Sequence, residues 1–376
     1  MKTNYLKLTG VFILSFFFFK CQREPNNFKK DRWSEDQAWA WQKKHGWMAG
    51  TNFNPSTAIN QLEFWQENTY DAETIEKELE WSAELGMNLH RVYLHNLLWE
   101  QDSIGFLRRL ENYLEIADKK AIKTLFVLLD DVWNPVPKLG KQPDPIPFVH
   151  NSGWVQAPGA AILGDSLRHQ EVKNYIKGVL SHFTNDPRVI AWDLYNEPDN
   201  VSSRGPEVKD KHIYSLSLLK KVFHWAREVN PSQPLTVGQW KGDYKNWGIL
   251  DSLSSIDRFA VSQSDVISFH AYGNINEVRT KIEALEKYNR PLLCTEYLAR
   301  GNENTFQKIL PLFKEKQVAA INWGFVAGKT NTAFPWSSWK EKFDSLPKIW
   351  HHDIYLPDKT PYDQKEINFL KEMLLK

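Results

Sequence analysis

Short runs of strand-favouring residues recur along most of the chain. They combine β-branched, aromatic and other apolar side chains over a few positions and end in Gly, Pro or polar residues, which is the pattern of buried strands. The predicted strands cover residues 47–54, 89–94, 122–129, 189–194, 235–240, 266–270, 291–297 and 318–325.

Segments with apolar residues at three- and four-residue spacing lie between these runs and predict helices. Gly86 follows the first of them and Pro231 follows the fourth, and both residue types favour the end of a helix. The predicted helices cover residues 73–85, 104–120, 169–184, 212–229, 250–258, 276–288, 305–316 and 364–375.

This alternation indicates the α/β class. Strands that alternate with helices are typical of parallel βαβ units, and eight such units favour a closed (β/α)8 TIM barrel. A doubly wound open sheet is the alternative. Its nucleotide-binding version is disfavoured because no Gly-rich phosphate turn follows the first strand. No linker divides the barrel, so we expect a single catalytic domain over residues 41–376.

The N-terminal segment has the pattern of a targeting sequence. Two lysines precede an apolar core at 11–19, which suits a signal peptide and is too short to span a membrane. Cys21 follows, as in a bacterial lipoprotein signal, although Lys20 stands where a small residue is usual. We expect a signal peptide of lipoprotein type over 1–21 and a polar tether over 22–40. Simple secretion and a retained anchor are the alternatives.

These features predict export to the periplasm or outer membrane, with membrane contact only through a lipid anchor on Cys21. The 47 basic and 46 acidic residues nearly balance, so no nucleic-acid partner is expected. The two cysteines show no disulfide or metal spacing. The 17 Trp residues indicate either stacking platforms for a ligand or a large aromatic core.

In a parallel barrel the active site lies at the C-terminal ends of the strands. Glu197 and Glu296 end the fourth and seventh predicted strands, and the curvature of a barrel brings those ends across one cavity. Glycoside hydrolysis needs such a pair, because one carboxyl group donates a proton to the leaving oxygen and the other attacks the anomeric carbon. The strand ends carry Asn52, Asn54, Arg91, His95, Asp130, Asp131, Asn196, Glu197, Gln239, Trp240, His270, Tyr272, Glu296, Tyr297, Asn322 and Trp323.

Residues 192–198, Trp-Asp-Leu-Tyr-Asn-Glu-Pro, resemble the acid/base motif of the clan A glycoside hydrolases, especially the cellulase-like family 5 and the barrel domain of family 2. The resemblance implies that Glu197 is the general acid/base. It also implies that Glu296, within Cys-Thr-Glu-Tyr at 294–297, is the nucleophile. It extends over about residues 47–375.

The same resemblance suggests roles for other strand-end residues. Arg91 is similar to the second-strand arginine that holds the nucleophile ionised in these families. His270 and Tyr272 are similar to a sixth-strand pair that contacts the sugar and the nucleophile. Trp323 is similar to the tryptophan beneath the reacting sugar. In the reaction itself, the amide of Asn196 can hold a 2-hydroxyl group.

Further substrate contacts are expected at Trp240 and Asp131, and Asp130, Trp133, Trp336 and Trp339 are additional candidates. The segment Asp-Asp-Val-Trp at 130–133 departs from the Asp-x-His that family 5 often carries after the third strand. A usual sugar contact is therefore altered in this chain.

Together these features predict a retaining glycosidase that acts on β-linked sugars of mannan, glucan or xylan type, with no cofactor and no metal. A metal-dependent barrel hydrolase is one alternative, but residues 51–54 contain no His-x-His pair. A non-catalytic glycan-binding lipoprotein with a barrel fold is another, and the intact carboxylate pair argues against it. The long loops 133–164 and 327–362 shape the cleft, so endo and exo action both stay open.

Overall fold

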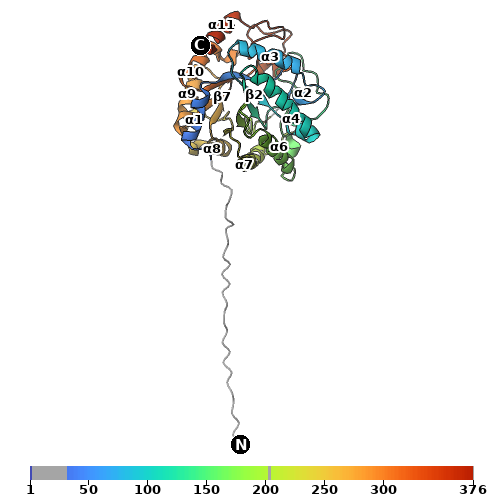
Figure 1. Ribbon diagram of the computed structural model, residues 1–376, viewed down its shortest axis with the longest axis vertical. Coiled ribbons are helices and arrows are strands. Elements are labelled where there is room, and N and C mark those ends of the chain that lie inside the picture. The colour runs from blue at the N-terminus through green and yellow to red at the C-terminus, as the bar shows by residue number, and fades with distance from the viewer. Residues whose placement is uncertain (2–31, 202–204, 376) are drawn as a thin grey trace.

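The computed structural model describes Met1 and residues 32–201 and 205–375 (Figure 1). The predicted signal peptide, Cys21 and the first part of the predicted tether lie outside the described residues apart from Met1. Among the described residues, no helix combines the length and the apolar composition needed to cross a bilayer.

Eight parallel strands form one sheet in the order β5-β4-β3-β2-β1-β8-β7-β6. The strands are β1 (Ala49–Asn52), β2 (Leu89–Tyr93), β3 (Lys123–Val127), β4 (Val189–Asp193), β5 (Leu235–Thr236), β6 (Ile267–His270), β7 (Leu292–Tyr297) and β8 (Ala319–Asn322). All eight fall inside the predicted runs.

Gln239 closes the sheet into a barrel. The backbone N–H of Gln239 donates to Ser268 O, and the N–H of His270 donates to Gln239 O, each at 2.9 Å, which links the end of β5 to β6. The prediction of a (β/α)8 TIM barrel is confirmed.

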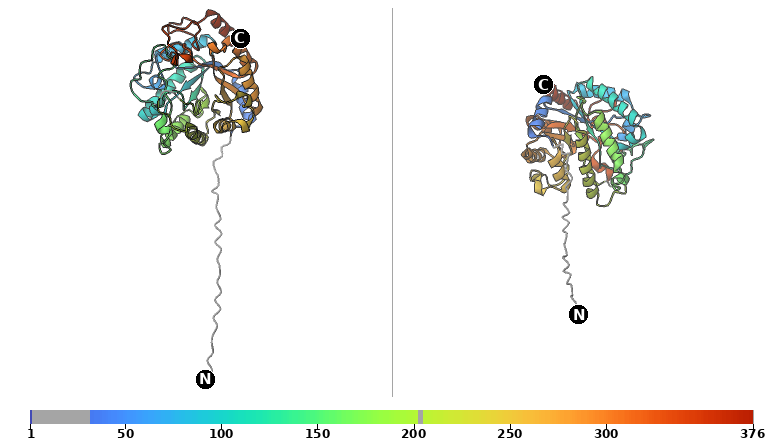
Figure 2. Two further views of the ribbon diagram at one scale, coloured as in Figure 1. Left: turned by 180° about the vertical axis from the view of Figure 1, so that it is seen from behind. Right: turned by 60° about the horizontal axis from the view of Figure 1, so that its bottom comes forward.

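The helices form a ring around this sheet, as Figures 1 and 2 show. They are α1 (Glu35–His45), α2 (Gln61–Trp65), α3 (Ala72–Glu84), α4 (Asn96–Asp118), α5 (Ala160–Leu163), α6 (His169–His182), α7 (Lys211–Val229), α8 (Ser255–Gln263), α9 (Ile275–Leu285), α10 (Phe306–Glu315) and α11 (Gln364–Leu374). Helix α4 starts earlier than predicted, because two helical segments join across a kink at Asp102. The short helix predicted at 250–258 is divided into a 3-10 turn (Leu250–Ser252) and α8.

Helix α1 corrects the predicted domain boundary. A capping box between Ser34 and Gln37 starts the helix, and Trp41 is buried against the residues that fill the barrel. The indole N–H of Trp41 donates to Ile190 O at 3.2 Å. The boundary predicted at residue 41 is therefore wrong, since residues 32–40 belong to the folded domain. The helix is mostly polar, and only Ala38 and Trp41 are buried, so its pattern was too weak to predict it.

Two layers of apolar side chains hold the barrel together. The inner cluster includes Leu89, Leu125, Leu293 and Ile321, which fill the barrel below its C-terminal end. The outer cluster packs the helices against the sheet and contains fully buried tryptophans, Trp192 among them. The aromatic-core interpretation of the Trp content is thus correct for these residues.

Candidate active site

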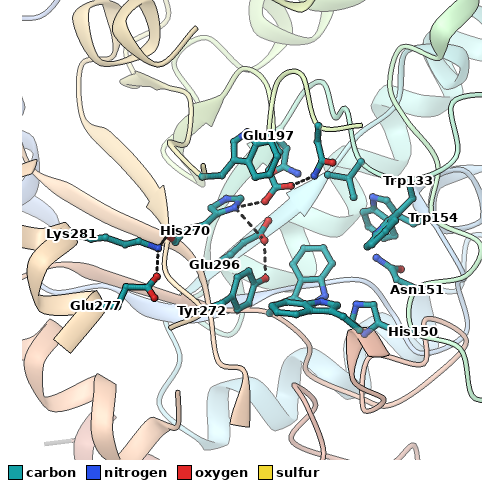
Figure 3. Close-up of a pocket in the computed structure, with 16 residues that line it drawn as sticks. Trp133, His150, Asn151, Trp154, Glu197, His270, Tyr272, Glu277, Lys281 and Glu296 are labelled. Atoms are coloured by element: carbon teal, nitrogen blue, oxygen red, sulfur yellow. Dashed lines mark hydrogen bonds and ion pairs between the residues drawn. The ribbon is translucent and has the colours of Figure 1, made fainter. Parts of the chain in front are cut away.

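A cavity of about 310 Å³ opens at the C-terminal end of the barrel (Figure 3). This volume lies at the lower end of the range for small-molecule sites. The lining combines strand-end residues with residues of the two long loops: Val132, Trp133, His150, Asn151, Trp154, Asn196, Glu197, Asn200, Trp240, His270, Tyr272, Glu277, Lys281, Glu296, Trp323 and Trp336.

Glu296, on β7, is buried and held by three hydrogen-bond donors. Its Oε1 accepts from Arg91 Nη1 at 2.9 Å and from the Tyr93 hydroxyl at 2.8 Å, and its Oε2 accepts from the Tyr272 hydroxyl at 2.8 Å. Burial raises the pKa of Glu296, but His270, Arg91 and the two hydroxyl groups outweigh it, so the pKa lies below its ordinary value. Glu296 is therefore ionised at neutral pH, as a nucleophile must be.

Arg91, on β2, lies beneath the cavity and does not line it. Its Nε and Nη2 donate to Asp193 Oδ2 at 3.0 and 2.8 Å, and Nη2 also donates to Asn196 Oδ1 at 2.7 Å. The structure thus places Arg91 as a positioning residue for Glu296 and Asn196. Its guanidinium is fully buried, so Arg91 contacts the carboxylate of Glu296, as the resemblance implied, and is not exposed to a substrate in the cavity.

Glu197 follows β4 and faces Glu296 across the cavity. Its Oε1 lies 2.8 Å from His270 Nδ1, and its Oε2 accepts from Asn200 Nδ2 at 2.5 Å. The backbone of Glu197 has φ +41°, a left-handed conformation that costs about 1–3 kcal/mol in a residue other than glycine. Such strain is characteristic of functional sites, where it fixes the direction of a side chain.

His270 lies between the two carboxylates. Its Nδ1 is 2.8 Å from Glu197 and 3.4 Å from Glu296 Oε2. One atom from each of the three side chains lies within 4.8 Å of the others, so the carboxylate oxygens are close together.

The same three side chains also form the one group within the described ranges that could hold a metal ion. The oxygens of Glu296, however, already accept hydrogen bonds from Arg91, Tyr93 and Tyr272. The guanidinium of Arg91 and the two tyrosine hydroxyl groups thus stabilise the negative charge of Glu296.

Asp130 positions two residues of the lining. Asn196 Nδ2 donates to its Oδ1 at 2.9 Å, and Trp154 Nε1 donates to its Oδ2 at 2.7 Å. Burial raises the pKa of Asp130 to about 8. Asp130 lies below the cavity surface, so it orients the Asn196 amide rather than contacting a sugar.

Asp131 is also outside the lining, and the prediction that it binds substrate is wrong. Its carboxylate accepts from Tyr195 OH at 2.8 Å, Ser215 Oγ at 2.6 Å and the backbone N–H of Asp199 at 2.7 Å. Successive residues at a strand end face opposite sides, so Asp131 points away from the barrel axis toward α7. It fixes the segment that follows Glu197.

The other residues predicted to contact substrate, Asn196, His270, Tyr272, Trp240 and Trp323, all line the cavity. Trp133 and Trp336 line it too, whereas Trp339 stacks on Trp133 with ring centroids 5.3 Å apart.

Sequence reasoning missed Tyr93, which donates a hydrogen bond to Glu296, and several residues that line the cavity. Tyr93 lies two positions after Arg91 on β2, so strand periodicity would have placed both on the inner face. The others carry no comparable signal, because most lie on loops or on α9: Val132, His150, Asn151, Trp154, Asn200, Glu277 and Lys281.

Comparison with known proteins shows similarity to glycosidases in sequence over part of the chain and in fold over most of it. The family model described as cellulase (glycosyl hydrolase family 5) matches residues 146–329. An exoglucanase, XynX, from Acetivibrio thermocellus is 26% identical over 182 residues, covering 41% of this chain and 16% of the relative. Endo-1,4-beta-xylanase A from Thermoanaerobacterium saccharolyticum is 24% identical over 210 residues, covering 48% of this chain and 18% of the relative. The chain thus spans less than a fifth of the length of these curated relatives.

Among solved structures, the endo-1,4-beta-mannanase from Rhizomucor miehei is similar in fold. It has a TM-score of 0.57 and 16% sequence identity, and the match covers 88% of this chain and 95% of that chain. The residues that match the family model include strands β4 to β8. The similarity in fold to the mannanase extends beyond these residues. Over residues 146–329 the chain is therefore similar to the cellulase-like glycosyl hydrolases of family 5, and its barrel fold is shared with glycosidases of known structure.

Proposed function

We propose that the chain is a retaining glycoside hydrolase that cleaves β-linked glycosidic bonds in oligo- or polysaccharides by double displacement. The observation that carries this proposal is the carboxylate pair: Glu296 is held ionised by Arg91 and two tyrosines, and an oxygen of Glu197 lies within 4.8 Å of it. The names of the relatives, an exoglucanase, a xylanase and a mannanase, support a neutral glycan of glucan, xylan or mannan type as substrate.

In the first step Glu296 attacks the anomeric carbon of a sugar that rests on Trp323. The bond from that carbon to the leaving oxygen breaks, and Glu197 transfers its proton to the leaving oxygen. Asn196 is placed to hold the 2-hydroxyl, because Arg91 and Asp130 fix both ends of its amide. The product of this step is a sugar ester on Glu296.

In the second step Glu197, now ionised, takes a proton from water. The water oxygen bonds to the anomeric carbon from the face that the leaving group vacated, and the ester bond breaks. Glu296 regains its charge, and the donors that surround it stabilise that charge at once. Two inversions at one carbon give net retention.

Replacing Glu197 or Glu296 by Gln tests the assignment of both groups. Glu197→Gln removes the transferable proton and should lower kcat on a β-glycoside with a poor leaving group by about 10²–10⁴-fold. Glu296→Gln removes the nucleophile and should lower kcat at least as much. Initial rates on oligosaccharides give the measurement.

Glu283→Gln, on the exposed side of α9, is the matched control and should keep wild-type turnover. Turnover near the wild-type rate in either catalytic variant would contradict the mechanism. Oligosaccharide binding with no turnover in the wild-type protein would favour a glycan-binding barrel instead.

Tyr272→Phe tests how the charge of Glu296 is maintained. The change removes a hydrogen bond to the ionised carboxylate, so the pKa of Glu296 should rise. At a given acidic pH less Glu296 is then ionised, and the acid limb of the profile of kcat/KM should move to higher pH. The control is Tyr214→Phe, an exposed tyrosine on α7. An unmoved acid limb would show that Tyr272 does not contribute to this pKa.

We also propose that the chain is exported and anchored to a membrane by lipid on Cys21. The support is the apolar core at 11–19 followed directly by this cysteine. In a bacterial host, Cys21→Ser should move the protein from the membrane fraction to the soluble fraction and abolish incorporation of labelled fatty acid. Equal fractionation of the variant and the wild-type protein would contradict the anchor.

A further inference from the structure

The two long loops contact each other beside the catalytic pair. The backbone N–H of His150 donates to Ser338 Oγ at 3.0 Å, and that of Asn151 donates to Thr330 O at 2.6 Å. The imidazole Nδ1 of His150 lies 2.9 Å from Phe334 O. Loop 133–159 and loop 327–362 are thus joined by backbone and side-chain hydrogen bonds, and together they form a continuous wall.

This wall lies on the side of the sugar that becomes attached to Glu296. Trp154, from the first loop, contacts Trp323, the platform of that sugar, with ring centroids 5.8 Å apart. Trp336, from the second loop, meets Tyr272 edge-on at 5.1 Å. Both of these partners belong to the surroundings of Glu296.

The leaving-group side has different walls. Trp240 donates from its indole to Pro198 O at 3.4 Å, next to Glu197. Figure 3 shows Trp133, Trp154, Asn151 and His150 together on one side of the carboxylates, and Glu277 and Lys281 on the other. The wall therefore limits the length of the glycone, which is the part of the substrate that becomes attached to Glu296.

Asn151 provides an unused hydrogen-bonding group on this wall. Its side chain lines the cavity and is 1% exposed, and its Oδ1 has no partner. Its backbone has φ +48°, a left-handed conformation that asparagine tolerates better than most residues. A buried acceptor without a hydrogen-bond partner lowers the stability of the folded protein. A hydrogen-bond donor on a bound ligand would therefore satisfy Asn151 Oδ1.

The wall is also uncharged. Burial lowers the pKa of His150 to about 3, so its imidazole is neutral near pH 7. Trp154, Trp336 and Asn151 add no charge. A neutral sugar hydroxyl is therefore the donor that fits the acceptor of Asn151.

We propose that the joined loops close the glycone side into a blind pocket, so that the enzyme removes single neutral sugars from the non-reducing end of its substrate, with Asn151 accepting a hydrogen bond from that terminal sugar. The inference rests on the proposed retaining glycosidase. A sugar that can extend no further beyond the wall must be the terminal one, and the cavity of about 310 Å³ is small for a site that holds several rings.

The test uses the full-length protein and oligosaccharides of mannan, glucan and xylan type that are labelled at the reducing end. On the substrate that is cleaved, labelled products should shorten by one sugar at a time, with free monosaccharide present from the first time point. The para-nitrophenyl β-monoglycoside of the same sugar should also be hydrolysed.

Labelled fragments from internal cleavage, or a disaccharide as first unlabelled product, would overturn the blind pocket. If Glu296→Gln abolishes that internal cleavage, the proposed glycosidase stands and only the exo inference fails. If Glu296→Gln cleaves as fast as the wild-type protein, or no β-glycoside is cleaved, the proposed function itself fails.

Asn151→Ala tests the hydrogen bond to the terminal sugar. We expect about tenfold lower kcat/KM on the monoglycoside, since one hydrogen bond is lost, and a slightly lower unfolding midpoint, since alanine tolerates φ +48° less well than asparagine. The control is Asn174→Ala, an exposed asparagine on α6 at the outer ring of helices. Wild-type kcat/KM in Asn151→Ala would overturn the role of Asn151.

Discussion

The buried guanidinium of Arg91 is the group on which the arrangement of the site depends. It joins β2 to Asp193 of β4, to Glu296 of β7 and to Asn196 beside Glu197. A fully buried cation is tolerated only when anions and acceptors surround it, and removing one partner of a buried pair costs about 3–5 kcal/mol. The same contacts that neutralise Arg91 therefore link β4 and β7, the strands that carry Asp193 and Glu296. The stability of the barrel and the geometry of the carboxylate pair depend on one network.

A second chain of contacts runs from this network to the wall of the cavity. Arg91 holds the carbonyl side of the Asn196 amide, and Asp130 holds its nitrogen side. Asp130 also accepts from the indole of Trp154, which belongs to the long loop after β3. Asp130 thus links the loop that carries Trp154, which in our proposal ends the glycone pocket, to the amide of Asn196, which in our proposal orients the sugar. Substrate length and substrate orientation depend on connected groups.

Much of this fold is predictable from the sequence because the information is local. Strand runs and their polar ends placed Glu197 after the fourth strand and Glu296 at the end of the seventh, and the structure brings both into one cavity. Prediction failed where position depends on distant contacts. Helix α1 is too polar to show a buried face, although Trp41 seals the inner cluster.

The loop residues show the same limit. Asn151 and Trp154 are placed by the other long loop and by Asp130, and nothing in their local sequence reveals those partners. The sequence also did not distinguish Asp130 from Asp131. The two carboxylates are adjacent in sequence but face opposite sides of the strand end.

The central claim is that Glu296 attacks the anomeric carbon while Glu197 serves as acid and then as base. Proton NMR of the anomeric signals during early hydrolysis of a β-glycoside tests it most directly. Double displacement predicts that the first sugar released has the β configuration and that the α form grows only as the product mutarotates. Release of the α form first would show inversion and would contradict the assignment of Glu296 as nucleophile.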